Sequence, residues 1–147
     1  MLPESEAGHW TLFEELASKR DLDDPDEYES VIRVQLQVLH SVADTLPEPA
    51  REAIAIASRF HDGVASEPEL EASRVAMWVL IKGRDCDFKD PFVCSIRALM
   101  CPMAPQTSNE SPYDILVLFM ELCDGAHVSS DSICRALRSV YGRTLSG

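Results

Sequence analysis

The feature that most limits how this chain can fold is its regular series of helix start and stop signals. Asp24 and Pro25 supply an N-cap and a first-turn proline, and Ser66 with Glu69 forms a capping box. Glycine commonly takes the left-handed conformation that ends a helix. Such signals predict seven helices over residues 11–19, 24–45, 47–62, 66–83, 90–102, 111–125 and 129–142, the first opened by a capping box of Thr11 with Glu14.

The spacing of apolar residues agrees with this prediction. Two stripes recur at helical intervals. Residues 115–120 are apolar on every side, so we expect their helix to be central and the most buried. The members of the two stripes are Ala72, Val75, Ala76, Val79 and Leu80, and Ile133, Ala136, Leu137, Val140 and Tyr141.

One segment shows a different pattern. Apolar and polar residues alternate from Ile32 to Val38, which is typical of a strand. However, no second segment offers a convincing pairing partner, and an unpaired strand is not stable. We therefore expect a helix here as well.

The chain has the size of one ordinary domain. Its 147 residues suffice for a core without metal or disulfide support. The longest apolar runs are far shorter than the roughly 20 residues that span a bilayer, and no basic and apolar leader opens the chain. The sequence thus predicts a single all-α domain over residues 1–147, an antiparallel bundle or array of about seven helices.

The net charge of −12 is concentrated in the first third of the chain. Residues 1–50 hold 12 acids and 3 bases, whereas residues 51–147 hold 13 acids and 10 bases. Such a surface repels nucleic acid and anionic membranes, which require clusters of Lys and Arg. It attracts a basic partner and speeds its association.

A cluster of six acids lies within nine residues near the start of the second predicted helix. It does not fit a calcium-binding loop, because Asp26 replaces the required glycine and Ile32 the final glutamate. A helix N-terminus favours carboxylates, but one or two suffice for capping. We therefore predict a partner-binding segment formed by Asp21, Asp23, Asp24, Asp26, Glu27 and Glu29.

The pair His61-Asp62 is the clearest sign of an enzyme. All-α metal-dependent phosphohydrolases of the HD class hold a divalent metal with a His, an adjacent His-Asp pair and a distant Asp. His40 could serve first, and Asp124 or Asp131 last. The alternative is that His61 lies in the last turn of its helix, where the helix dipole favours histidine.

The five cysteines indicate a reducing compartment. Their number is odd and no C-x-x-C pair occurs, which argues against both a disulfide framework and a zinc site. Cys123, His127 and Cys134 lack the paired spacing of zinc ligands. We expect a cytoplasmic protein without a cofactor.

Residues 50–78 resemble a known family. They form an alanine-rich helix, a glycine turn and a second helix with a Leu-x-x-x-Arg pattern. This arrangement is similar to helical immunity proteins encoded beside bacterial polymorphic toxins. The residues that carry the resemblance are Ala53, Ile54, Ala57, Phe60, Gly63, Leu70, Glu71, Ala72, Arg74, Ala76 and Trp78.

The resemblance implies a bacterial cytoplasmic protein that binds and neutralises a basic toxin domain, without catalysis of its own. The resemblance assigns no functional residues of the family to positions of this chain. Two alternatives remain open at this point: a secretion chaperone or adaptor with a similarly acidic surface, and the HD-type phosphohydrolase.

Overall fold

The computed structural model describes residues 4–104 and 110–146, and its regular structure over these residues is helical throughout. The prediction of an all-α fold is confirmed, including the helix over the alternating segment Ile32 to Val38. The α-helices are α1 (Glu4–Lys19), α2 (Tyr28–Val42), α3 (Glu48–His61), α4 (Glu67–Leu80), α5 (Pro91–Met100), α6 (Pro112–Gly125) and α7 (Ser130–Ser146), with 3-10 turns η1 (Pro25–Glu27), η2 (Ala43–Thr45) and η3 (Cys101–Met103).

Four of the helix starts follow one local rule. A short polar residue accepts a hydrogen bond from a backbone N–H in the first turn, and a proline occupies one of the first two helical positions. Asp24, Asp90 and Ser111 cap η1, α5 and α6 in this way. Ser66 and Glu69 form the predicted capping box of α4. The sequence therefore places these starts correctly by local chemistry alone.

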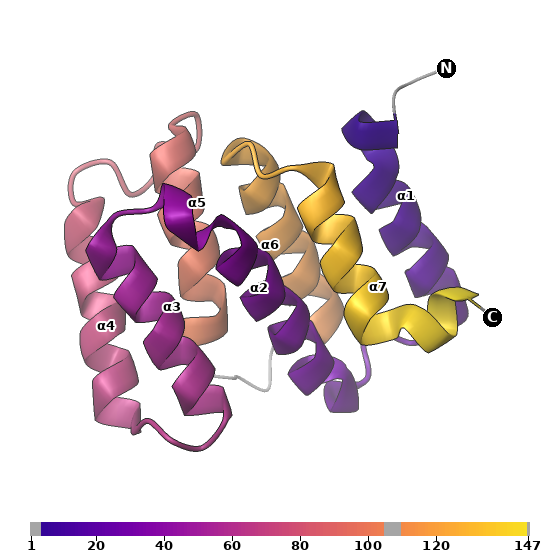
Figure 1. Ribbon diagram of the computed structural model, residues 1–147, viewed down its shortest axis with the longest axis horizontal. Coiled ribbons are helices and arrows are strands. Elements are labelled where there is room, and N and C mark those ends of the chain that lie inside the picture. Colours follow the sequence, from indigo (N-terminus) through magenta and orange to yellow (C-terminus); the bar gives the residue numbers. More distant parts are fainter. Residues whose placement is uncertain (1–3, 105–109, 147) are drawn as a thin grey trace.

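Successive helices run in alternating directions and form two layers (Figure 1), with α5 and α6 behind α2 and α3. The first and last helices close the array at one end, where α1 packs along α7. These two helices are parallel, because His9 near the start of α1 bonds Ser130 at the start of α7, while Arg20 just after α1 bonds Thr144 near the end of α7. The helix α4 lies at the opposite end of the array.

The core lies between the two layers and extends beneath α1 and α7. Its largest fully buried side chains come from six of the helices and from residues beside them. They are Leu16, Ile54, Met77, Ile81, Ile96, Leu99, Met103, Leu116, Phe119, Met120, Ile133 and Leu137.

The start of the first helix was predicted wrongly. Helix α1 begins at Glu4, so Thr11 lies in its middle and exposed, and Trp10 is a helical residue rather than one that precedes a cap. A Thr followed by a Glu three residues later can stand inside a helix, where backbone carbonyls already satisfy the N–H groups that a cap would serve. Contacts of His9 and Trp10 with α6 and α7 hold the earlier turns in place.

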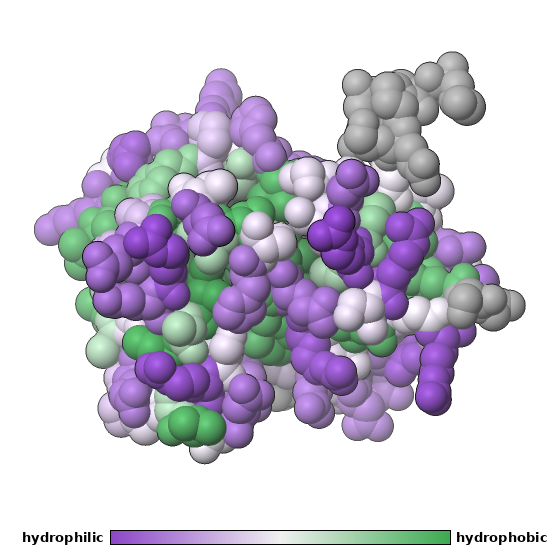
Figure 2. All heavy atoms as spheres, viewed as in Figure 1, coloured by the Kyte–Doolittle hydropathy of each residue, from purple (hydrophilic) through white to green (hydrophobic). Residues whose placement is uncertain are grey.

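The apolar surfaces of two helices also differ from expectation. Helix α6 is not enclosed on every side, because Leu118 is 54% exposed. On α4, Leu70 and Met77 face the core, whereas Val75 and Val79 of the apolar stripe are 51% and 64% exposed. Figure 2 shows hydrophobic surface at the left edge of the molecule, where Figure 1 places α4.

The helix over the C-terminal residues extends past its predicted end. Tyr141 leaves the helical conformation, with φ −114° and ψ 21°, just before Gly142. The chain then resumes a helical path to Ser146. The glycine thus marks a bend, and the last turn continues beyond it.

Two smaller points complete the fold. Of the predicted loop over residues 103–110, residues 105–109 lie outside the described residues. Within the described residues, no helix combines the length and apolar character that a membrane crossing requires.

We expect that Gly125→Ala destabilises the fold by about 1–3 kcal/mol, because overpacking of a filled site forces its neighbours to move. A Cβ atom at Gly125 would lie 2.6 Å from Sγ of Cys94, which is buried and bonds the carbonyl of Phe88. Gly142→Ala is the control, since a Cβ there meets nothing within 4 Å. Urea unfolding measures both variants, and equal stabilities would show that α5 and α6 are less tightly packed than described.

Candidate functional site

We call the predicted partner-binding segment, residues 21–29, the acidic segment. It spans the connection between α1 and α2 and the first residues of α2, and most of its acidic side chains point to solvent. Asp21, Asp23, Asp24, Asp26 and Glu29 are all exposed. The carboxylate of Asp21 accepts a bond from the backbone N–H of Asp23 at 3.1 Å, and that of Asp24 accepts one from Asp26 at 2.9 Å. Each of these bonds occupies only one oxygen of its carboxylate, and no positive charge is involved. The segment therefore presents a concentrated negative charge.

Glu27 differs from the rest of the acidic segment. It is buried, and it forms an ion pair with Arg20. Arg20 also donates to the hydroxyl of Thr144 at 3.1 Å and lies 5.3 Å from the ring centre of Tyr141. Burial, and then the negative charge of Glu27, raise the pKa of Tyr141 above its ordinary value. Glu27 therefore connects η1 to α7, and we leave it out of the partner surface.

Next to the acidic segment lies a groove between α2, α3 and α4, with a volume of about 930 Å³. We call it the acidic groove. Apolar side chains line its interior, namely Ile32, Leu36, Phe60, Leu70 and Met103. Four carboxylates and two guanidinium groups also line it, namely Glu29, Asp62, Glu67, Glu71, Arg33 and Arg74.

The charges of the acidic groove do not cancel. Arg74 pairs with Glu71 on its own helix. Arg33 alone then faces the three remaining carboxylates, of Glu29, Asp62 and Glu67, none of which forms an ion pair within the described residues. The groove thus combines an apolar interior with an excess of negative charge, and Glu29 joins it to the acidic segment.

A smaller hollow of about 470 Å³ adjoins the acidic groove and shares Tyr28, Glu71 and Arg74 with it. Its apolar lining includes Trp78 and Leu118, which are 41% and 54% exposed. The guanidinium group of Arg97 lies 4.9 Å from the ring centre of Trp78, which favours a cation–π contact.

The histidines of the hypothetical HD site are directed elsewhere. His40 bonds the hydroxyl of Ser58 at 2.8 Å, and Nε2 of His61 donates to the carbonyl of Pro102 at 2.7 Å. Asp62 is the C-cap residue that follows α3, and it lines the acidic groove. Within residues 4–104 and 110–146, no group of three or more His, Cys, Asp or Glu side chains is arranged to hold a metal ion.

The environment of the buried thiols disfavours a reactive centre. Cys94, Cys123 and Cys134 are buried, and all five cysteines are free. Burial raises the pKa of Cys101 to about 12 and also raises the pKa of Cys123. Such groups remain protonated thiols at neutral pH, and the thiolate is the nucleophilic form.

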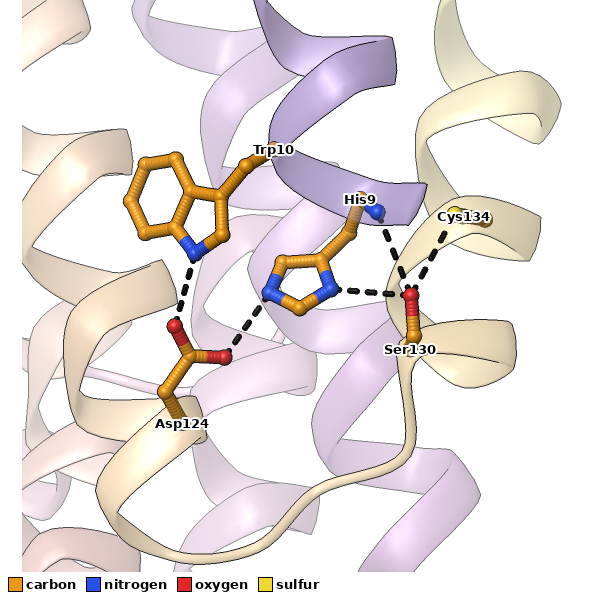
Figure 3. A network of polar contacts seen from close by, with 5 residues as sticks. All are labelled: His9, Trp10, Asp124, Ser130 and Cys134. Atoms are coloured by element: carbon orange, nitrogen blue, oxygen red, sulfur yellow. Dashed lines mark hydrogen bonds and ion pairs between the residues drawn. The ribbon is translucent and has the colours of Figure 1, made fainter. Parts of the chain in front are cut away.

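A polar network that is buried at His9 and Ser130 and exposed at Asp124 joins α1, α6 and α7 (Figure 3). The hydroxyl of Ser130 lies 2.9 Å from Nδ1 of His9, and Nε2 of His9 lies 2.8 Å from Asp124. The indole N–H of Trp10 donates to the other oxygen of Asp124 at 2.7 Å. The three residue types are those of a Ser-His-Asp triad, but here the serine meets Nδ1 and the aspartate meets Nε2, the reverse of the serine-protease order. The function of such a triad also depends on substrate access to the serine hydroxyl.

Substrate access is lacking in this network. Ser130 and His9 are 6% and 4% exposed, and neither lines the groove or the smaller hollow. Because the carboxylate of Asp124 only accepts, Nε2–H of His9 donates to it. In the neutral imidazole Nδ1 then accepts from the hydroxyl of Ser130, whose oxygen also accepts the backbone N–H of His9 at 3.1 Å. Every polar group in this chain of bonds is satisfied, so we interpret the network as a clamp that fastens α1.

The sequence predicts neither the clamp nor the acidic groove. His9 and Ser130 are 121 residues apart, and neither belongs to a motif. The sequence indicates Asp124 only as a possible last ligand of the HD-type metal site. The groove gathers residues from three helices, and their shared position follows from packing. The signal that the sequence offers for the clamp is that His9, Asp124 and Ser130 each lie near a predicted helix end.

Comparison of this chain with models of protein families, with curated proteins and with solved structures finds no significant match in any of the three. The surface of the molecule therefore carries the information on its function.

We expect that Ser130→Ala destabilises the protein by about 1–3 kcal/mol, because it leaves buried polar groups of His9 without a partner. Amide hydrogen exchange should become faster in α1 before the rest of the protein responds. Ser18→Ala is the matched control, since that exposed serine bonds only a carbonyl of its own helix, and its effect should stay within about 0.5 kcal/mol. Unchanged exchange in α1 would refute the clamp.

Proposed function

We propose that this chain is a protein-binding module that receives a basic, amphipathic segment of its partner in the acidic groove. The observation that carries the proposal is the continuity of the exposed acidic segment with the groove through Glu29. The acidic segment attracts the partner over a distance, and the apolar interior of the groove supplies the short-range contacts.

The chemistry of the groove supports this choice of partner. Apolar side chains of the partner would cover Leu36 and Phe60, which are half-buried. Lys or Arg side chains would pair with Glu29, Asp62 and Glu67. Helix-in-groove recognition uses the same combination, in which apolar residues of one face anchor the helix and charges along the edge orient it.

In its most specific form, the proposal is an immunity protein of the bacterial cytoplasm that neutralises a cognate toxin. A toxin that acts on a polyanion carries a basic surface, and an acidic inhibitor can bind and cover it. The helix pair α3 and α4, which carries the family resemblance, also forms one side of the groove. A secretion chaperone or adaptor would use the same surface, whereas the HD-type phosphohydrolase has no comparable support.

We expect that Asp62→Asn with Glu67→Gln weakens binding of a labelled amphipathic peptide with Lys on one face and Leu on the other. Fluorescence anisotropy measures the affinity, which should fall about tenfold or more for two lost charge contacts. Glu14→Gln with Glu52→Gln removes the same charge from exposed acids that do not line the groove.

The matched control should bind like the unmodified chain. A second peptide, with Glu in place of Lys, should not bind. Equal loss in both double variants would mean that net charge alone attracts the peptide, and this would contradict the groove.

The acidic segment should act mainly on the rate of association. In a variant with Asp21, Asp23 and Asp26 replaced by Asn and Glu29 by Gln, we expect stability equal to or slightly above that of the unmodified chain, because repulsion between like charges is relieved. Stopped-flow mixing with the Lys-Leu peptide should show slower association and a shallower dependence on salt. A variant that unfolds more easily but associates at the unchanged rate would show that these acids serve the fold.

A further inference from the structure

The outer face of α4 is an apolar surface with no partner among the described residues. Ala72, Val75, Ala76 and Val79 are exposed, and they follow one another at the spacing of a single helix face. None of the four lines the acidic groove or the smaller hollow. A contiguous exposed apolar patch on a soluble protein commonly marks an interaction site.

The charges on this helix and just after it are unevenly placed. Of the exposed acids in its first turns, Glu67 and Glu71 line the acidic groove, whereas Glu69 lines neither the groove nor the smaller hollow. From residue 72 to residue 84 the chain contains no acid, although its net charge is −12, and its charged residues there are Arg74, Lys82 and Arg84. Lys82 is exposed and forms no ion pair within the described residues.

We propose that two copies of this chain pair through α4, with the two helices antiparallel and related by a twofold axis. In this arrangement Glu69 near the start of each α4 lies beside Lys82, just after the end of α4, of the other copy, and the apolar faces meet between them. The charge pattern is therefore complementary to itself, as an interface with twofold symmetry requires. The small side chains of Ala72 and Ala76 let the two helices approach closely.

The position of α4 in the fold also suits a second copy. It lies at the free end of the array, away from the end that α1 and α7 close (Figure 1), so a second copy can approach without displacing a helix. The acid-free stretch reduces the repulsion that two chains of charge −12 would otherwise meet. This pairing does not depend on the proposed function, because the acidic groove is lined by other residues of α4.

Sedimentation velocity over a series of protein concentrations tests the pairing. We expect the mass to rise with concentration from the 16.3 kDa of one chain toward twice that value. Val79→Asp should abolish the rise, because it places two charges in the apolar contact. Val64→Asp is the matched control, since Val64 is 72% exposed in the connection between α3 and α4, outside the proposed face, and this variant should associate like the unmodified chain.

A charge variant tests the antiparallel direction. Lys82→Glu places a second acid beside the acid near the start of α4 of the other copy, at both ends of the interface. The repulsion should raise the dissociation constant of the pair about tenfold or more. Thermal unfolding should show that all three variants remain folded. A constant mass of one chain at every concentration would overturn the proposal. An equal effect of Val64→Asp and Val79→Asp would also overturn it, and a Lys82→Glu variant that associates more tightly would exclude the antiparallel arrangement.

Discussion

The packing of α1 along α7 is the interaction on which the rest of the structure depends, because it joins the two ends of the chain and closes the array. Two polar connections fasten it. Near the start of both helices His9 bonds Ser130 and Asp124, and near their ends Arg20 bonds Glu27 and Thr144. Between these connections α1 buries Leu16 fully. Buried polar groups are costly unless they are paired, so the two connections also fix how α1 lies on α7.

This closure makes the two ends of the array unlike. At one end α1 covers α7, and the polar network satisfies the groups that it buries. At the other end no helix of the described residues lies outside α4, and Val75 and Val79 remain exposed. The same apolar spacing that buries Ile133 and Leu137 of α7 therefore leaves a free face on α4. An amphipathic pattern requires that an apolar face be covered, but it does not specify by which chain.

Charge is distributed in a similarly uneven way. The acidic segment carries five exposed acids, four before α2 and Glu29 in its first turn, and only Glu27 turns inward, where Arg20 compensates it. The excess of acidic side chains continues into the acidic groove, whereas the sequence from residue 72 to residue 84 contains no acid. Attraction of a basic partner and pairing of two copies thus involve separate surfaces of α4. The binding function and the pairing can be tested independently for that reason.

The sequence by itself determined the helices that begin with a local cap, because Asp24, Ser66, Asp90 and Ser111 act within their own first turns. It also determined the exposed acidic segment, since six acids in nine residues cannot all be buried. Only the tertiary structure decided that α1 extends back to Glu4, that Glu27 is buried and that His9 meets Ser130. These features depend on contacts between residues distant in the chain, and helix periodicity contains no information about which helix will cover which.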